Sequence, residues 1–309
     1  MKSFMGLLLP LLLSATMAEA GEGTASELVL RGDFAVSGVV LIDDDEEEPI
    51  TLVVDGASPS RPILNPELVD RADIGKSMIG GGFLIGPIEL DADTKVVKYR
   101  FGDLDWKSRS LWTDLSYAPN HDGGVGPLGL PHDVVRIQWR REQAGEKLCT
   151  FPLDNRGSAV TRIAMGEKII DIGFTQKRGK SLSTAAAGAV IADFHDGEFV
   201  GESDSTEIAY GIERPIRKLA LAEPLDLCGV SLDSFYVRKS DFGDSSGIID
   251  GDLARANADS SEIVVMAANG KKDKNRYFLT IGQDDLQHCS SVTYDKVAKE
   301  IRLSCFMRQ

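Results

Sequence analysis

The run Ile50-Thr-Leu-Val-Val-Asp-Gly-Ala57 is an apolar, β-branched segment that ends in an acid followed by a glycine. Short β-branched runs bounded by turn residues are typical of strands. The run therefore predicts a strand with Asp55 in the turn at its end. Two glycine-rich segments follow it along the chain, Lys76-Ser-Met-Ile-Gly-Gly-Gly-Phe-Leu-Ile85 and Asp122-Gly-Gly-Val-Gly-Pro-Leu-Gly-Leu-Pro131.

Strand signals dominate the rest of the chain, and helical periodicity is scarce. Pro66-Glu-Leu-Val-Asp70, capped by Asn65, predicts one or two helical turns, and Asp252 to Ala258 suit another. The sequence thus predicts an all-β fold with a few short helices. The further predicted strands are Leu28–Leu30, Val39–Ile42, Val134–Ile137, Ile169–Ile172, Glu262–Met266 and Tyr277–Ile281.

A weak internal repeat indicates two similar β lobes. Residues 28–54 and 160–184 each suggest strand, charged tip, strand, and each leads into small residues, Asp55-Gly-Ala-Ser58 and Ala185-Ala-Ala-Gly-Ala189. The lobes are predicted at 21–155 and 156–309. A motif near the end of each half recurs at an offset of 156 residues: Gly126, Leu130 and His132, then Gly282, Leu286 and His288.

The composition excludes several classes of partner. The chain has 309 residues, 48 acidic and 34 basic, and a formal net charge of −14. Nucleic acid and anionic lipid are poor partners for such a chain, because phosphates must be met by Lys and Arg. The four His and four Cys include no finger or ribbon spacing, so we expect no metal and no cofactor.

The first twenty residues look like a secretory signal. Lys2 gives a positive start, Leu7 to Leu13 an apolar run, and Ala18-Glu-Ala20 a small-x-small cleavage site. The apolar run is shorter than the roughly 20 residues of a transmembrane helix. We therefore expect cleavage near Ala20, a periplasmic or secreted bacterial protein, and no membrane insertion afterwards. The oligomeric state stays open.

Outside the cytosol, four cysteines can form two disulfides. Folding the segment between Cys289 and Cys305 about Val297 as strand, turn, strand places these two cysteines opposite each other. The pairing of Cys149 with Cys228 follows only by elimination.

The order of motifs resembles the aspartic peptidases over nearly the whole chain after residue 20. Their lobes carry a strand ending in Asp-Thr-Gly-Ala/Ser, a β-hairpin flap, and an apolar-apolar-Gly segment behind the catalytic loop. Met78-Ile-Gly-Gly-Gly-Phe83 looks like a retroviral flap tip, and Asp122-Gly-Gly-Val-Gly126 is similar to the Asp-Gly-Ile-Leu-Gly of pepsin-type lobes. Leu279-Thr-Ile-Gly-Gln-Asp-Asp-Leu286, followed by Val292-Thr-Tyr-Asp295, looks like the closing motif of retropepsin-like lobes.

The resemblance implies two lobes with a cleft between them and two aspartates, one per lobe, that share one proton. Asp55 stands where the first belongs, although Gly-Ala-Ser follows it instead of Thr-Gly. In the second half, matching Ala186 to Gly188 with Asp-Thr-Gly places a methyl group where the second carboxylate belongs. Hydrolysis by the usual dyad is therefore in doubt.

Three functions remain open from the sequence. The first is a degenerate peptidase that binds extended polypeptide without cutting it. The second is an acid endopeptidase in which Asp55 works with an unrecognised acid or a dimer mate. The third is an envelope scaffold with a closed cleft. Asp55 could also be a plain turn residue, and the flap a glycine-permissive loop. The predicted contact residues for a peptide are Gly56, Lys76, Met78, Gly80, Gly81, Gly82, Phe83, Ala186 and Gly188, beside Asp55.

Overall fold

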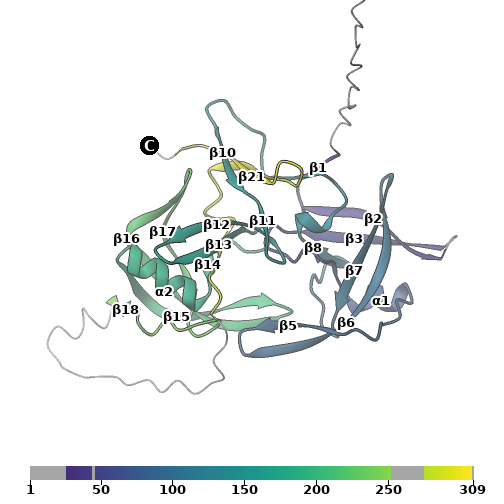
Figure 1. Ribbon diagram of the computed structural model, residues 1–309, viewed down its shortest axis with the longest axis horizontal. Coiled ribbons are helices and arrows are strands. Elements are labelled where there is room, and N and C mark those ends of the chain that lie inside the picture. Colours follow the sequence, from purple (N-terminus) through teal and green to yellow (C-terminus); the bar gives the residue numbers. More distant parts are fainter. Residues whose placement is uncertain (1–25, 44–45, 252–274, 308–309) are drawn as a thin grey trace, which may run out of the picture.

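The computed structural model describes residues 26–43, 46–251 and 275–307, and within these residues the chain is mostly β (Figure 1). Two α-helices and three sheets make up the described part. The all-β prediction is confirmed. The predicted signal segment 1–20, strand 262–266 and helix 252–258 lie outside the described residues.

The first sheet has seven strands in the order β2-β3-β8-β4-β7-β6-β5. In strand β3, Ile50, Leu52 and Val54 are buried and alternate with partly exposed residues, because successive side chains of a strand point to opposite faces of the sheet. Helix α1 begins at Pro66, as predicted. The bounds are β2 Ala35–Asp43, β3 Glu46–Val54, β4 Ile63–Leu64, α1 Pro66–Arg71, β5 Gly81–Ile85, β6 Ile88–Phe101, β7 Leu104–Trp112 and β8 Gly123–Val125.

The second sheet has nine strands in the order β11-β12-β13-β19-β14-β17-β16-β15-β18. Helix α2 begins after Thr184, whose hydroxyl accepts a hydrogen bond from the Ala187 N–H. The bounds are β11 Asp154–Asn155, β12 Ala159–Met165, β13 Lys168–Phe174, β14 Leu182–Ser183, α2 Ala185–Phe194, β15 Gly197–Ala209, β16 Ile212–Leu227, β17 Val230–Arg238, β18 Ile249–Asp250 and β19 Phe278–Ile281.

The two sheets repeat one topology. The pairings β2·β3, β3·β8, β8·β4, β4·β7, β7·β6 and β6·β5 recur as β12·β13, β13·β19, β19·β14, β14·β17, β17·β16 and β16·β15, each with the same parallel or antiparallel sense. The helices α1 and α2 each follow the equivalent short strand, β4 or β14. The internal repeat is therefore present in the fold. The offset of 156 residues found near the end of each half relates β8 and the Gly126 that follows it to β19 and the Gly282 that follows it.

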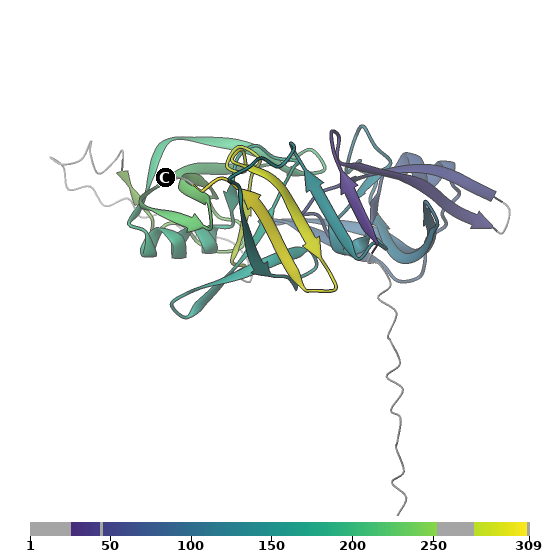
Figure 2. The ribbon, with the colours of Figure 1, turned by 90° about the horizontal axis from the view of Figure 1, so that it is seen from above.

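A third sheet, β1-β9-β20-β21-β10, takes its strands from the beginning, the middle and the end of the described chain. Figure 2 shows β20 and β21 (yellow) in the middle of the molecule, between the parts built by the two repeats. Most buried apolar side chains of the three sheets form one hydrophobic cluster, and Ile63, Ile85 and Tyr210 belong to a second, smaller one. The bounds are β1 Glu27–Leu30, η1 (a short 3₁₀ turn) Pro127–Gly129, β9 Val134–Gln138, β10 Lys147–Pro152, β20 Cys289–Asp295 and β21 Glu300–Cys305.

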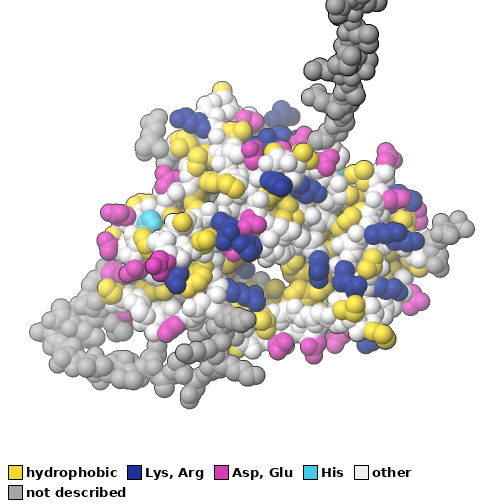
Figure 3. All heavy atoms as spheres, in the orientation of Figure 1, with side chains coloured by type: hydrophobic (Ala, Val, Ile, Leu, Met, Phe, Trp, Pro, Cys, Tyr) yellow, Lys and Arg dark blue, Asp and Glu magenta, His cyan; other side chains and the backbone are white. Residues whose placement is uncertain are grey.

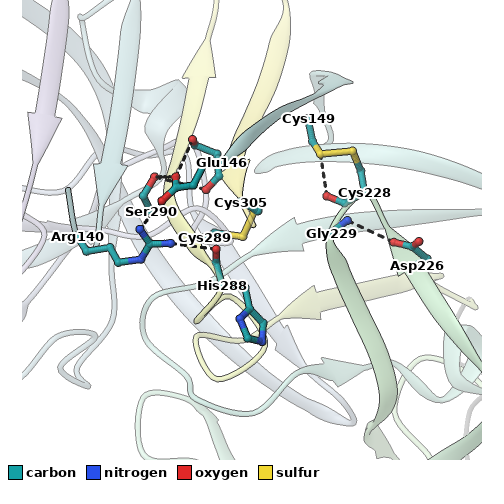
Figure 4. The surroundings of a disulfide bond; sticks show 11 residues. Arg140, Glu146, Cys149, Asp226, Cys228, Gly229, His288, Cys289, Ser290 and Cys305 are labelled. Carbon is teal, nitrogen blue, oxygen red and sulfur yellow. Dashed lines mark hydrogen bonds and ion pairs between the residues drawn. A yellow bond between two sulfur atoms is a disulfide. The ribbon is translucent and has the colours of Figure 1, made fainter. Parts of the chain in front are cut away.

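Both predicted disulfides are present (Figure 4). Cys289 and Cys305 lie opposite each other on β20 and β21, as the strand–turn–strand prediction requires. Cys149 on β10 is joined to Cys228 in the turn between β16 and β17. Disulfides persist in oxidising compartments, so the pair of them indicates a protein that works outside the reducing cytoplasm. In the described ranges, no helix has the length and apolar character needed to cross a bilayer.

Candidate functional site

Asp55 lies in the loop directly after β3, and it is 3% exposed. Its N–H donates to the carbonyl of Val125 at the end of β8, at 3.2 Å. The second repeat builds the same junction: the N–H of Thr175, directly after β13, donates to the carbonyl of Ile281 at the end of β19, at 2.9 Å. Thr175 is therefore the counterpart of Asp55 in the second repeat.

The two loops touch through the Asp55 carboxylate. The Thr175 hydroxyl donates to Asp55 Oδ1 at 2.7 Å, and the main-chain N–H groups of Gln176 and Lys177 donate to the same oxygen at 2.6 and 3.3 Å. A carboxylate oxygen that accepts three hydrogen bonds from one loop ties that loop to its own. The Asp55 carboxylate thus joins the two repeats.

The other oxygen of Asp55 is held by its own loop. Asp55 Oδ2 accepts from the Ala57 N–H at 3.2 Å and from the Ser58 hydroxyl at 3.3 Å. The Ser58 hydroxyl also shares a 2.8 Å hydrogen bond with the Tyr117 hydroxyl. Every hydrogen-bond partner of the Asp55 carboxylate among the described residues is a donor, and none of these partners is a second carboxyl group.

Gly56 packs too closely for any other residue. A Cβ atom there would lie 1.9 Å from the Tyr294 hydroxyl oxygen and 2.3 Å from the Phe174 carbonyl oxygen. The Gly56 N–H donates to Gln176 Oε1 at 3.0 Å. The glycine is needed because the loop presses against β20 and against the end of β13.

The match of Ala186 and Gly188 to a second catalytic loop is wrong. These residues belong to helix α2, where Ala186 is 5% exposed and Gly188 packs against Val237 and Ser183. Alanine-rich runs favour helix, and Thr184 caps this one. The equivalent segment in the first repeat is α1, so the correct offset from Asp55 is 120 residues, to Thr175.

A cavity of about 940 Å³ opens at the Asp55–Thr175 junction, with walls from both repeats. Figure 3 shows the face hollowed there, with lysine and arginine side chains (dark blue) on both sides. The charged residues of its lining are Asp55, Lys177, Arg178, Lys180, Glu207, Arg238 and Asp284. The described residues contain no group of three or more His, Cys, Asp or Glu side chains placed to hold a metal ion.

Lys177 and Tyr117 face each other in this cavity. Lys177 Nζ lies 3.5 Å from the centre of the Tyr117 ring. By accessible surface, Lys177 is an exposed residue on the cavity side, while surrounding protein atoms partly remove water from its ammonium group. Burial lowers the pKa of Lys177 to about 8, although the charges of Asp55 and Glu207 oppose this. Burial, with the charge of Asp55, raises the pKa of Tyr117.

The flap prediction is right about a hairpin and wrong about its tip. Strands β5 and β6 pair from Gly81↔Ala92 to Ile85↔Ile88, so the tip is Gly86–Pro87. Met78, which was predicted at the tip, precedes β5 and is fully exposed. Lys76 and Gly80 also precede the strand, and Lys76 lies 3.6 Å from Asp93 in an exposed ion pair. Gly81, Gly82 and Phe83 lie within β5.

The second repeat contributes a matching hairpin, which the sequence analysis missed. Strands β15 and β16 turn at Tyr210–Gly211, and the Tyr210 ring contacts both Phe83 of β5 (5.3 Å between centroids) and Tyr117 (5.4 Å). Figure 1 shows the tips of β15 and β16 reaching β5. The two hairpins therefore meet through an aromatic cluster beside the cavity.

Only Asp55 of the predicted contact residues lines the cavity itself. Gly56 lies behind it, Phe83 packs against the second hairpin, and the remainder lie elsewhere. The residues that the sequence analysis missed are Thr175, Lys177 and Arg178. Lys177 and Arg178 belong to the segment 176–180, which was interpreted as the charged tip between two strands, and Thr175 lies just before it. Comparison of the chain with protein-family models and with curated proteins gave no match.

Proposed function

We propose that this protein is an exported, aspartic-peptidase-like protein that binds extended polypeptide in the cavity at the Asp55–Thr175 junction and does not cut it. The observation that carries the proposal is the identity of residue 175. A peptidase dyad needs one ionised carboxylate, which takes a proton from water, and one protonated carboxyl, which supports the developing oxyanion. At this junction a threonine hydroxyl donates to Asp55 where the second carboxyl would stand.

The repeated architecture supports the resemblance to aspartic peptidases. Each repeat has a strand that ends in a loop at the junction, and a second strand that passes behind the loop and accepts its first N–H, through Val125 or Ile281. A glycine directly follows each of these second strands, Gly126 after β8 and Gly282 after β19. A Cβ at either glycine would lie within 2.3 Å of a carbonyl oxygen, so neither position tolerates another residue without movement.

The strands around the cavity suit an extended ligand. Thr206 to Ala209 of β15 line the cavity wall, and β18, which follows β15 at the end of that sheet, pairs only with Glu198 and Phe199 among the described residues. A peptide that adds as a strand gains main-chain hydrogen bonds from such an edge and selectivity from side-chain pockets. The predicted signal segment and the two disulfides support a periplasmic or secreted location for this binding.

A peptide-capture experiment tests the proposal. A random peptide library is passed over the immobilised full chain, and the bound peptides are eluted and identified by mass spectrometry. Thr206→Trp fills the cavity from β15, and Glu202→Trp adds the same ring to an exposed position of that strand outside the cavity lining.

We expect uncut peptides to be enriched by the wild type and by Glu202→Trp and lost from Thr206→Trp. Capture that is equal in both variants would place binding elsewhere and contradict the proposal. Recovered fragments that vanish in Asp55→Asn would replace it with an acid endopeptidase. No enrichment at all would favour a scaffold with a closed cavity.

A further inference from the structure

Two cations beside Asp55 have no carboxylate partner among the described residues. Of the four cations that line the cavity, Lys180 pairs with Asp204 at 3.3 Å and Arg238 with Asp241 at 2.5 Å. Lys177 and Arg178 make no such ion pair within the described ranges. They follow Thr175 and Gln176 directly, so they stand at the junction itself.

The contacts of Lys177 and Arg178 leave donors available. Lys177 Nζ faces the Tyr117 ring, whose negative face attracts it. Arg178 Nη2 donates to the carbonyls of Glu207 and Ile208, both at 3.4 Å. A guanidinium has five N–H donors, so these two long hydrogen bonds do not exhaust it.

Asp55 does not neutralise this pair by contact. Its two oxygens already accept from Thr175, from Ser58 and from main-chain N–H groups. Lys177 and Arg178 thus present two cationic groups to the cavity with no ion-pair partner among the described residues, in a chain whose formal net charge is −14. A partly enclosed patch of this sign attracts anionic groups, and its low dielectric strengthens the attraction.

We infer that the cavity selects extended segments that bring a carboxylate to Lys177 and Arg178. The inference rests on the proposed peptide binding and adds its specificity. Two sources can supply this carboxylate: an aspartate or glutamate side chain within the segment, or the free C-terminus of the segment. Charge-assisted hydrogen bonds to an anion are the strong class, so the loss of one weakens binding by about tenfold or more.

Two libraries separate the sources. Both are random ten-residue peptides, one capped at both ends and one with a free C-terminus, and each is captured on the full chain. Acidic residues enriched at a fixed position of the capped library identify a side-chain carboxylate. A preference confined to the uncapped library identifies the C-terminus.

Substitutions then assign the preference to the site. Lys177→Gln should weaken capture of the preferred peptides by about tenfold, and Lys177→Glu should shift the preference towards Lys and Arg. The matched control is Lys98→Gln, an exposed lysine of β6 outside the cavity lining, which should change nothing.

The pH dependence gives an independent readout. Lys177 is faced by Asp55 after β3, Glu207 on β15, Arg178 on its own loop and Tyr117 across the cavity. Because its pKa is lowered to about 8, affinity for the preferred peptide should fall as the pH rises from 7 to 9. Lys177→Gln should abolish this fall.

The results separate a failure of this inference from a failure of the proposed peptide binding. Capture that depends on the cavity, lost in Thr206→Trp and kept in Glu202→Trp, but without acidic preference in either library overturns the inference and leaves the proposed function standing. A preference that survives Lys177→Gln also overturns it. Absence of cavity-dependent capture in both libraries overturns the two together.

Discussion

At the scale of single residues, the pairing of Asp55 with Thr175 sets what the junction can do. Two carboxyl groups in this position would compete for one proton, because like charges about 3 Å apart cannot both ionise. A hydroxyl donates to a carboxylate without that conflict. The Thr175 hydroxyl donates a 2.7 Å hydrogen bond to Asp55 at the place where a peptidase dyad would need its second carboxyl group.

Thr175→Asp should place two carboxyl groups at the junction, where they compete for one proton. One carboxyl of the new pair keeps its proton in the folded state, so its folded pKa lies above its unfolded value. The folded state then binds more protons than the unfolded one, and the free energy of unfolding falls as the pH rises. Urea unfolding at pH 4 and pH 7 should show a larger deficit at pH 7 for Thr175→Asp. Thr175→Asn, which does not titrate, serves as the control, and equal deficits for both variants would show that no proton is shared.

Sequence reasoning found Asp55 and could not find its partner. Asp55 has a visible signature, a β-branched strand ending in Asp-Gly. The strand before Thr175 was predicted at 169–172, but Thr-Gln-Lys has neither the acid nor the glycine of that signature. The small residues at 185–189 drew the match instead, although three successive alanines after a threonine also predict a capped helix.

At the scale of elements, the hairpins β5–β6 and β15–β16 are equivalent parts of the two repeats, and they meet. Gly86 at the first tip lies so close to Asp241 that a Cβ would be 2.4 Å from Asp241 Oδ1. Asp241 is held by Arg214 and Arg238, and although burial raises its pKa, these arginines lower it overall. The first hairpin thus ends on a fixed ion cluster of the second repeat.

Tyr210→Ala should weaken the contact between the hairpins β5–β6 and β15–β16. The ring is 7% exposed and contacts Phe83 and Tyr117. Its removal should cost about 3 kcal/mol of unfolding free energy and speed amide hydrogen exchange at 81–92 and 205–216. Tyr210→Phe should behave as wild type, because the buried Tyr210 hydroxyl has no hydrogen-bond partner among the described residues. Unchanged exchange in Tyr210→Ala would show that the ring does not hold the hairpins together.

Glu146, directly before β10, links its loop to β20 and β21 through side-chain hydrogen bonds (Figure 4). Its side chain is fully buried and accepts hydrogen bonds from the Ser290 and Ser304 hydroxyls at 2.6 and 2.9 Å, beside an ion pair with Arg140. Burial alone would raise the pKa of Glu146, but these donors lower it below its usual 4.5.

Glu146→Gln should therefore cost about 2–4 kcal/mol at pH 7. A carboxyl with a lowered folded pKa contributes stability above its unfolded pKa and loses it as the pH falls. The difference between wild type and Glu146→Gln in urea unfolding should shrink from pH 7 to pH 3. A difference that is independent of pH would show that the charge of Glu146 has no part in it.

At the scale of the whole molecule, two repeats of one topology share the five-stranded sheet. Cys149–Cys228 joins that sheet to the second repeat across 79 residues, whereas Cys289–Cys305 spans 16 residues within a hairpin. In the chain-entropy account, the longer loop contributes more, about 4.5 kcal/mol against about 3 kcal/mol. The disulfides thus differ in what they constrain.

Replacing both cysteines of a disulfide by alanine should lower the unfolding free energy more for the disulfide that closes the longer loop. Cys149→Ala with Cys228→Ala should lower the unfolding free energy more than Cys289→Ala with Cys305→Ala, by about 1.5 kcal/mol. Urea unfolding of the two double variants measures this. The opposite ranking would show that strain or residual structure in the unfolded chain outweighs loop length.

Much of this architecture could be predicted from the sequence. The β-branched runs, the helix at Pro66 and the Cys289–Cys305 disulfide follow from local patterns, the Cys149–Cys228 disulfide follows by elimination, and the 156-residue offset located the end of each repeat. The meeting of the hairpins could not be predicted, because it depends on where Phe83 and Tyr210 arrive in space. The cavity cations were visible only as a charge run, since nothing local places Lys177 beside Asp55.

Native mass spectrometry of the protein with a captured peptide tests the central claim most directly. After prolonged incubation between pH 3 and pH 7, we expect the complex to retain the full mass of the peptide, in wild type and in Asp55→Asn alike. A peptide shortened by wild type and left whole by Asp55→Asn would contradict a junction that binds without cutting.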